Sequence, residues 1–322
     1  MSTIWLRALM ALCTAGLATA AAAQAWPARP VRVVVAFTAG GTTDLLARNI
    51  GQQLQERLKQ PFVVDNKPGA GGNLGTEIVV RAPADGYTLI VDSVGPIAVN
   101  PTLYPKLPYN PITDLVPIVL IADVPNVLVV HPSVPAKTLD EFIAHAKANP
   151  GRLNYASTGI GTSSHLSGFI LGKRAGIDAT HVPYKGADAL RDLLAGRVQF
   201  MFATIPSVKG QIDAGTLRAI AVSSAKRSRS LPEVPTVAER GYPGFEAGSW
   251  FGFFGPKGTP DEVVTTLNKA VNEILGVAST EAALVKEGAD PVGGTPQQFG
   301  AFVQKEFEKW RAVVRESGAT VE

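Results

Sequence analysis

The sequence has almost no cysteine. Its 322 residues include one, Cys13, which lies in the N-terminal segment. Leu12 before it is too large for a typical lipid-attachment signal, so we do not expect a lipid anchor. If this segment is removed, the mature chain contains no disulfide and relies on its hydrophobic core, which suits an exported bacterial protein.

Charge is also sparse. Asp, Glu, Lys and Arg make up 18% of the residues, the formal net charge is +3, and no block of like charges occurs. Nucleic acids and anionic membrane surfaces are bound by concentrated basic patches, which this chain lacks. We therefore expect neither as a partner.

Long apolar runs are missing after the N-terminal segment. The richest stretch, residues 115–130, is interrupted by Pro117, Asp123 and Pro125, so it is no clean membrane span of about 20 apolar residues. Hydrophobic residues still make up 46% of the chain. That composition is sufficient for globular cores, and the length predicts about two domains.

The first residues are typical of a secretory signal. Arg7 supplies a positive charge, residues 8–17 are apolar, and Ala23-Gln24-Ala25 matches a cleavage site. We predict that residues 1–25 are a signal peptide, that the mature chain begins at Trp26, and that the protein resides in the periplasm.

Signatures of catalysis, metals and cofactors are absent. No G-x-S-x-G elbow occurs, and the four histidines show no metal-binding spacing. The turn 69–75 nearly matches a dinucleotide fingerprint, but Leu74 replaces its third glycine. We expect no enzyme activity, no cofactor and no metal, although a secreted α/β hydrolase remains the alternative.

The most informative stretch is a loop between a strand and a helix. The apolar run 31–36 predicts a buried parallel strand, and residues 45–58 have helical spacing. The loop that joins them attracts anions, because glycines allow close approach and the first N–H groups of a helix lack partners. A turn capped by Thr42, Thr43 or Asp44 is the structural alternative. The candidate ligand-binding residues here are Phe37, Thr38, Ala39, Gly40, Gly41, Thr42, Thr43 and Asp44.

A second loop of the same kind follows the strand 153–156. It is rich in glycine and hydroxyl groups and leads into the helix 165–175. Such groups can hold carboxylate oxygens without a full positive charge, although a capped turn is again the alternative. Its candidates are Ser157, Thr158, Gly159, Gly161, Thr162, Ser163 and His165, the last as a wall residue rather than a base. Two such loops predict one ligand held from both sides.

Strands alternating with helices predict a doubly wound α/β fold, with ligands at the carboxyl ends of the strands. Further candidates at strand ends are Ser93, Tyr184, Lys185, Ala203 and Thr204. Capping-box spacings at Thr138 with Glu141 and at Thr259 with Glu262 predict two helix starts. We place a first lobe at residues 26–122, a second at 123–225, and a return to the first at 226–322, which ends in a helix over 296–317.

Several motifs, in order along the mature chain, resemble one family. They are Trp26-Pro27-Ala28-Arg29-Pro30-Val31-Arg32, Phe37-x-x-Gly40-Gly41-x-x-Asp44, Asn66-Lys67-Pro68-Gly69-Ala70-Gly71-Gly72, Ala84-Asp85-Gly86-Tyr87-Thr88-Leu89, Tyr155-Ala156-Ser157-x-Gly159-x-Gly161-Thr162, Pro183-Tyr184-Lys185-Gly186, Leu231-Pro232-x-Val234-Pro235-Thr236 and Gly252-Phe253-Phe254-Gly255-Pro256. The chain thus resembles the extracytoplasmic receptors of tripartite tricarboxylate transporters, the Bug (TctC-like) family of solute-binding proteins.

The resemblance implies a periplasmic-binding-protein fold of type II, with two lobes joined by two crossing strands around a central cleft. It implies that the loops at Ala39–Thr43 and Ser157–Ser163 hold a small carboxylate, a di- or tricarboxylate or an aromatic acid, which a membrane permease then receives. A monomer is expected. Service to a signalling partner is a further alternative.

One departure from the family pattern concerns the ligand. The family often has Asp-Asn where this chain has Ala203-Thr204. If that Asp faces an amino group, its loss argues against an amino-acid ligand, and Ala203→Asp should weaken carboxylate binding.

Overall fold

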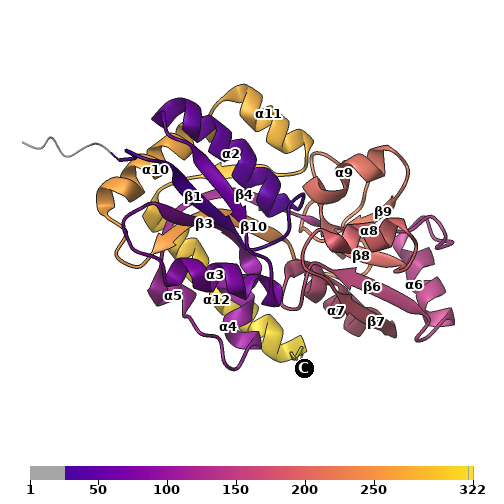
Figure 1. Cartoon of the computed structure of the whole chain (residues 1–322). Helices are drawn as coiled ribbons and strands as arrows, with labels where there is room; N and C mark the ends of the chain where they lie inside the picture. The colour runs from indigo at the N-terminus through magenta and orange to yellow at the C-terminus, as the bar shows by residue number, and fades with distance from the viewer. Residues whose placement is uncertain (1–25, 318, 322) are drawn as a thin grey trace, which may run out of the picture.

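The computed structural model describes residues 26–317 and 319–321. The predicted signal peptide therefore lies outside the described residues. Over the described part of the chain, the strands form a six-stranded and a five-stranded sheet, each the centre of one lobe (Figure 1). No helix in this part is long and apolar enough to cross a membrane.

The sheet of the first lobe is mixed. Its strands, in spatial order, are β11 (Asp290–Gly293), β4 (Leu115–Val124), β10 (Ser249–Pro256), β3 (Thr88–Ser93), β1 (Val31–Val35) and β2 (Phe62–Asn66). β1, β2 and β3 are parallel, as predicted, whereas β10 runs antiparallel to β3 and β4. The doubly wound pattern is thus interrupted by the strand that returns from the second lobe.

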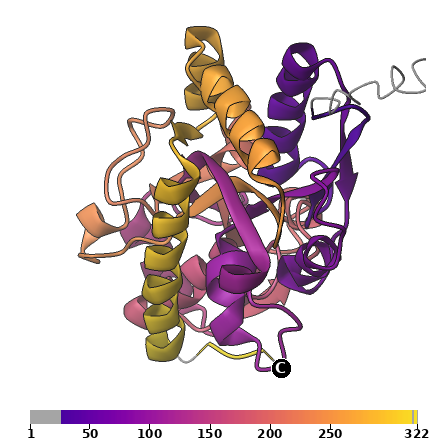
Figure 2. The same cartoon turned by 90° about the vertical axis from the view of Figure 1, so that its left-hand side faces the viewer.

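Helices cover both faces of this sheet. In the described residues they are α2 (Thr42–Leu58), α3 (Asn73–Val80), α4 (Asn100–Leu103), α5 (Pro111–Asp114), α10 (Asp261–Leu275), α11 (Ala278–Lys286) and α12 (Pro296–Ser317), with short turns at η2 (Ala70–Gly72) and η3 (Gly95–Val99). β1 shows why both faces are covered: Val33 packs with the cluster under α2 and α10, whereas Val34 packs with the opposite cluster, which includes α12. Figure 2 shows α12 running along the outside of this lobe.

The second lobe repeats the arrangement on a smaller scale. Its strand order is β7 (Ala179–Pro183), β6 (Leu153–Ser157), β8 (Phe200–Thr204), β5 (Asn126–Val130) and β9 (Arg218–Val222). Its described helices are α6 (Leu139–Ala148), α7 (Ser163–Ala175), α8 (Asp188–Leu194) and α9 (Ile205–Asp213), and η4 (Ala238–Arg240) lies in the connection back to the first lobe. β6, β7 and β8 are parallel, so their carboxyl ends share one edge.

Two passages of chain join the lobes side by side. β4 leads through Pro125 directly into β5, and β10 begins beside β4, where Ser249 pairs with Val124. The side chain of Asn126 donates to the carbonyl of Ala247 at 2.8 Å, which ties the two passages together. This matches the predicted fold of two lobes joined by two crossing strands.

The segment between β9 and β10 contacts both lobes, through Arg229 with Asp290 and Glu246 with Lys309 on the first lobe and through backbone bonds on the second. Residues 226–247 were expected in the first lobe, but Val222 exchanges backbone hydrogen bonds with Pro235 and Val237. This pairing attaches the segment to the edge of the second sheet. We therefore propose that the second passage lies near Gly248.

One predicted capping box is confirmed and the other is wrong. Thr138 accepts from the N–H of Glu141, and the Glu141 side chain accepts from the N–H of Thr138. Thr259 instead donates its hydroxyl to the carbonyl of Pro256, and α10 starts after Pro260 without a side-chain cap. Because that hydroxyl closes the preceding turn, it is not free to cap the helix.

The Thr138 cap should contribute to the stability of the second lobe. We expect Thr138→Ala to lower the free energy of unfolding by about 1 kcal/mol, because the backbone N–H of Glu141 loses its hydroxyl acceptor. Urea unfolding followed by circular dichroism measures this change. Thr138→Ser keeps the hydroxyl and should retain most of the stability; an equal loss in both variants would contradict the role of the cap.

Candidate functional site

The first loop brings the N-terminus of α2 to the space between the lobes. Gly40 has a positive φ of 86°, which lets the chain turn sharply after β1. Gly41 is the N-cap of α2 and provides no side-chain cap. Within the described residues, the N–H groups of Thr42 and Thr43 have no protein acceptor. No side chain of Thr42, Thr43 or Asp44 accepts from the first N–H groups of α2, so the helix end keeps free donors, although Asp44 fixes the turn before it.

Asp44 holds this loop in place from behind. Its carboxylate accepts from the N–H of Gly40 at 3.0 Å, from Asn66 at 3.0 Å and from Arg48. Burial raises the pKa of Asp44, but these hydrogen bonds and the Arg48 charge outweigh it and lower the pKa below its ordinary value. Asp44 is thus ionised and committed to structure, and it does not line the cavity described below.

The second loop is organised by Thr162. Its hydroxyl donates to the carbonyl of Gly159 at 2.7 Å and accepts from the N–H of His165, which makes it the N-cap of α7. Gly161 has a positive φ of 82° and lies against Asn100 of the first lobe, so a side chain at this position would collide. The N–H groups of Ser163 and Ser164 have no acceptor among the described residues.

Two stacked histidines support this loop. The rings of His165 and His181 lie 4.2 Å apart between centroids, and Nδ1 of His165 accepts from the N–H of Gly161. His181 contacts the Ser157 hydroxyl through Nε2 at 2.7 Å. Burial lowers the pKa of His165 to about 4, and burial together with the neighbouring His165 lowers that of His181 to about 3. Both rings are therefore neutral at pH 7.

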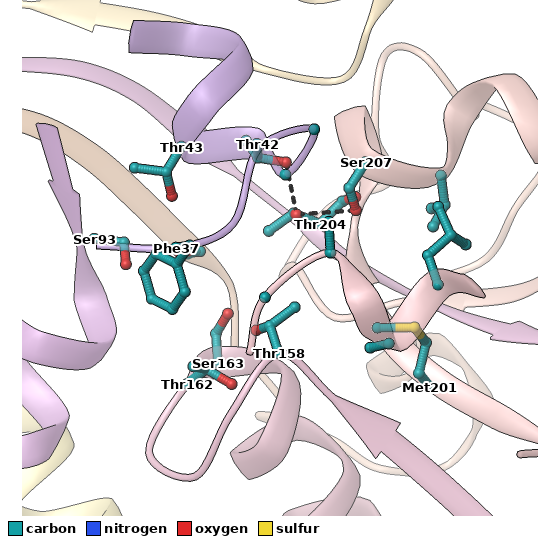
Figure 3. Close-up of a pocket in the computed structure, with 18 of the residues that line it drawn as sticks. Phe37, Thr42, Thr43, Ser93, Thr158, Thr162, Ser163, Met201, Thr204 and Ser207 are labelled. Atoms are coloured by element: carbon teal, nitrogen blue, oxygen red, sulfur yellow. Dashed lines mark hydrogen bonds between the residues drawn. The ribbon is translucent and has the colours of Figure 1, made fainter. Parts of the chain in front are cut away.

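The two loops face one cavity. It contains about 640 Å³ of empty space, a volume that includes the solvent at its open mouth. Figure 3 shows hydroxyl groups of both lobes around it. Its lining consists of Phe37, Gly40, Gly41, Thr42, Thr43, Ser93, Thr158, Thr162, Ser163, Gly186, Ala187, Ala189, Leu190, Met201, Thr204, Ser207, Val208, Ser249 and Phe251.

The lobes also contact each other directly. The hydroxyls of Thr42 and Thr204 lie 2.7 Å apart, and Thr204 in turn donates to Ser207 at 3.3 Å (Figure 3). The N–H of Ala187 donates to the hydroxyl of Thr38 at 2.8 Å. Farther out, Tyr104 of the first lobe donates to the carbonyl of Ile160 in the second.

About half of the predicted site residues line this cavity. Those that do are Phe37, Gly40, Gly41, Thr42, Thr43, Ser93, Thr158, Thr162, Ser163 and Thr204. Those that do not are Thr38, Ala39, Asp44, Ser157, Gly159, Gly161, His165, Tyr184, Lys185 and Ala203. Several of the second group shape the loops instead, so the assignment of ligand contacts stays a prediction.

Three of the residues that do not line the cavity lie in other identifiable environments. The Tyr184 hydroxyl donates to Asp192 at 2.8 Å, and Lys185 is exposed. Ala203 is 1% exposed and packs in the core cluster of the second lobe, on the same face of β8 as Met201, whereas Thr204 lines the cavity from the end of the strand. An Ala203→Asp substitution would therefore bury a carboxylate in the core, so it would test folding rather than ligand preference.

Sequence reasoning missed the residues supplied by α8, α9 and β10. Ala189, Leu190 and Val208 have the spacing of ordinary core residues, so nothing marks them as cavity lining. Ser207 offered a weak signal, since a hydroxyl residue three positions after Thr204 is common at helix starts. Among the lining residues that the structure describes, none is charged.

No group of three or more His, Cys, Asp or Glu residues that could hold a metal ion occurs in the described ranges. Beside the cavity, Asp92 is fully buried and accepts from the Thr76 hydroxyl at 2.6 Å and from the N–H of Ser93. Burial raises the pKa of Asp92 to about 7 despite these bonds. Asp92 supports the strand end that presents Ser93.

The histidine pair predicts a particular pH dependence. Because the pKa of His165 is lower in the folded chain than its ordinary 6.5, the unfolded chain binds more protons between pH 6.5 and 4, and stability falls as the pH falls. Asp92 has the opposite effect on the pH dependence of stability, since its raised pKa favours folding at low pH. Comparing wild type with a variant that lacks the His165 ring separates the effect of His165 from that of Asp92.

We expect His165→Gln to destabilise the protein most at pH 7 and progressively less as the pH falls toward 4. Each unit of the lowered pKa corresponds to about 1.4 kcal/mol. Urea unfolding at pH 7, 6 and 5 gives the difference from wild type, and His145→Gln, on α6, is the control. A difference that stays constant over this pH range would show that the His165 ring does not titrate as inferred.

The whole chain has clear relatives. It is 42% identical to the protein BugT of Bordetella pertussis over 96% of this chain and 95% of BugT. It is 41% identical to a UPF0065 protein from the tcbD-tcbE intergenic region of Pseudomonas sp. strain P51, over 91% of this chain and 88% of that protein.

Solved structures share the fold. The R. palustris protein Rpa4515, solved with adipate, matches with a TM-score of 0.89 and 42% identity, covering 91% of this chain and 98% of that one. MatC from Rhodopseudomonas palustris, solved with bound malate, matches with a TM-score of 0.86 and 35% identity, covering 90% and 100%. The periplasmic binding protein BugD matches with a TM-score of 0.89 and 36% identity, covering 92% and 100%.

A family model described as the tripartite tricarboxylate transporter family receptor matches residues 46–319. This range includes the second sheet, every strand of the first sheet except β1, the second loop and the C-terminal helix. Together with the relatives, it shows that the chain belongs to the family of tripartite tricarboxylate transporter receptors, the solute-binding proteins predicted from its motifs.

Proposed function

We propose that this protein binds a small carboxylate between its lobes and delivers it unchanged to the membrane permease of a tripartite tricarboxylate transporter. The observation that carries the proposal is the meeting of two loops from different sheets at one cavity, each with free N–H groups at a helix start. Aligned N–H groups and hydroxyls bind carboxylate oxygens without a cationic side chain. Relatives solved with adipate and malate support the ligand class.

The proposed cycle makes and breaks no covalent bond. The ligand enters when the lobes separate, and it favours closure because both loops contact it only when the lobes meet. We infer that the lobes move about the two passages at Pro125 and Gly248, where few residues need to change conformation. We place the protein in the periplasm, with residues 1–25 removed as a signal peptide, and we expect a monomer.

Binding should be seen as stabilisation by an intact acid. Purified mature protein is screened by thermal shift against citrate, malate, adipate, hexanoate and benzoate, and hits are measured by calorimetry. The ligand recovered after incubation should be unaltered by mass spectrometry. A hydrolase would release a new product, and a protein unaffected by every acid would contradict the proposal.

The hydroxyl of Thr43 should contribute to affinity. Thr43 is 4% exposed, lines the cavity and keeps its hydroxyl free of protein partners within the described residues. We expect Thr43→Val, which preserves shape, to weaken binding of the best acid about tenfold, since a hydrogen bond to a charged group is worth about 1.5–3 kcal/mol. Thr265→Val, on the exposed side of α10, is the matched control and should leave the dissociation constant unchanged.

A contact outside the cavity should also affect affinity. Tyr104 holds Ile160 across the lobes and does not line the cavity. Tyr104→Phe removes this bond and should weaken binding about fivefold, because a net hydrogen bond of about 1 kcal/mol then no longer favours closure. Calorimetry checks this, and an unchanged constant would mean that the contact also exists in the open form.

A further inference from the structure

The cavity has a polar end and an apolar end. The polar end lies between the starts of α2 and α7, where Thr43, Ser93 and Ser163 present hydroxyls around Phe37 (Figure 3). Met201 lies on the other side of Thr204 in the same view. One cavity thus joins two environments that favour different chemical groups.

The apolar end lies inside the second lobe. It is lined by side chains from β8, α8 and α9 and from the loop before α8. All of them are aliphatic or thioether groups: Ala187, Ala189, Leu190, Met201 and Val208. Met201, Ala189 and Val208 belong to the buried core cluster of this lobe, with exposed fractions of 2% or less. These side chains offer no hydrogen-bond donor to an anion.

Two hydroxyls between the two ends, those of Thr204 and Ser207, already have partners. The Thr204 hydroxyl is 2.7 Å from that of Thr42 and 3.3 Å from that of Ser207. Ser207 donates to the carbonyl of Thr204 at 2.7 Å. A second carboxylate placed against Leu190, Met201 and Val208 would therefore lose its water and gain neither a cation nor a side-chain donor from these residues in return, which is strongly unfavourable.

We propose that the ligand is a monocarboxylate with an uncharged apolar body, held with its carboxylate at the polar end and its body between β8, α8 and α9. This inference rests on the proposed function and narrows its ligand class. A dicarboxylate of the same length would have to put its second charge against Met201, Leu190 and Val208. The apolar lining thus favours monocarboxylates because it disfavours the second charge of a dicarboxylate.

Hexanoate and adipate test this directly, because they share a six-carbon chain and differ in the second carboxylate. Calorimetry or ligand-observed NMR with the purified mature protein should give at least tenfold tighter binding for hexanoate. 1-Hexanol, which lacks the carboxylate, should bind at least tenfold more weakly than hexanoate. Adipate binding as tightly as hexanoate, or more tightly, overturns the inference but leaves the proposed function standing.

Two variants test whether the apolar end of the cavity causes the preference for hexanoate over adipate. Val208→Thr keeps the shape of the side chain but adds a hydroxyl to the apolar end, so it should reduce the preference for hexanoate over adipate severalfold. Val182→Thr introduces the same change in a residue that packs on the same core cluster without lining the cavity, so it should leave the preference unchanged. Thermal melts confirm that both variants fold. If both variants change the preference for hexanoate over adipate equally, the preference does not arise at the apolar end.

The outcomes separate the two proposals. If hexanol binds as well as hexanoate, or if no acid of the panel binds, the carboxylate has no role and the proposed function fails together with the inference. If acids bind with adipate preferred, only the apolar selection fails.

Discussion

Unpaired backbone N–H groups at the starts of α2 and α7 are the constraint on which the rest of the structure depends. Every helix leaves its first donors without partners, and here two such ends face each other from different sheets. Each follows a parallel strand, so the carboxyl edges of both sheets must meet. The paired passages at Pro125 and Gly248 bring these edges together.

The charged and titratable groups around the cavity act through the backbone rather than on the ligand. Asp44 fixes the turn at Gly40, and His165 fixes the turn at Gly161. Asp92 does the same for the strand end at Ser93. Placing these groups behind the loops preserves the orientation of the N–H donors and keeps full charges out of the lining.

How much of this could be predicted from the sequence depends on how local the signal is. The β1 loop, the α7 loop and the Thr138 cap each rest on adjacent residues, so their patterns were readable. Whether a candidate residue points into the core or into the cavity could not be predicted. Ala203 and Thr204 are neighbours, yet Ala203 is buried in the core and Thr204 lines the cavity. Leu190 and Val208 reach the cavity only because α8 and α9 pack beside β8, which no short pattern encodes.

The uncharged lining has a consequence for the evolution of the site. A pocket built around an arginine is difficult to change, because any ligand without a matching anion leaves a buried charge unpaired. In the binding mode that we propose, the anion is held by main-chain groups that persist through every side-chain replacement except proline, so the aliphatic positions can vary one at a time while capture of the acid group persists. A duplicated copy of such a protein could acquire a new acid as its cargo through few substitutions, each of them neutral in charge.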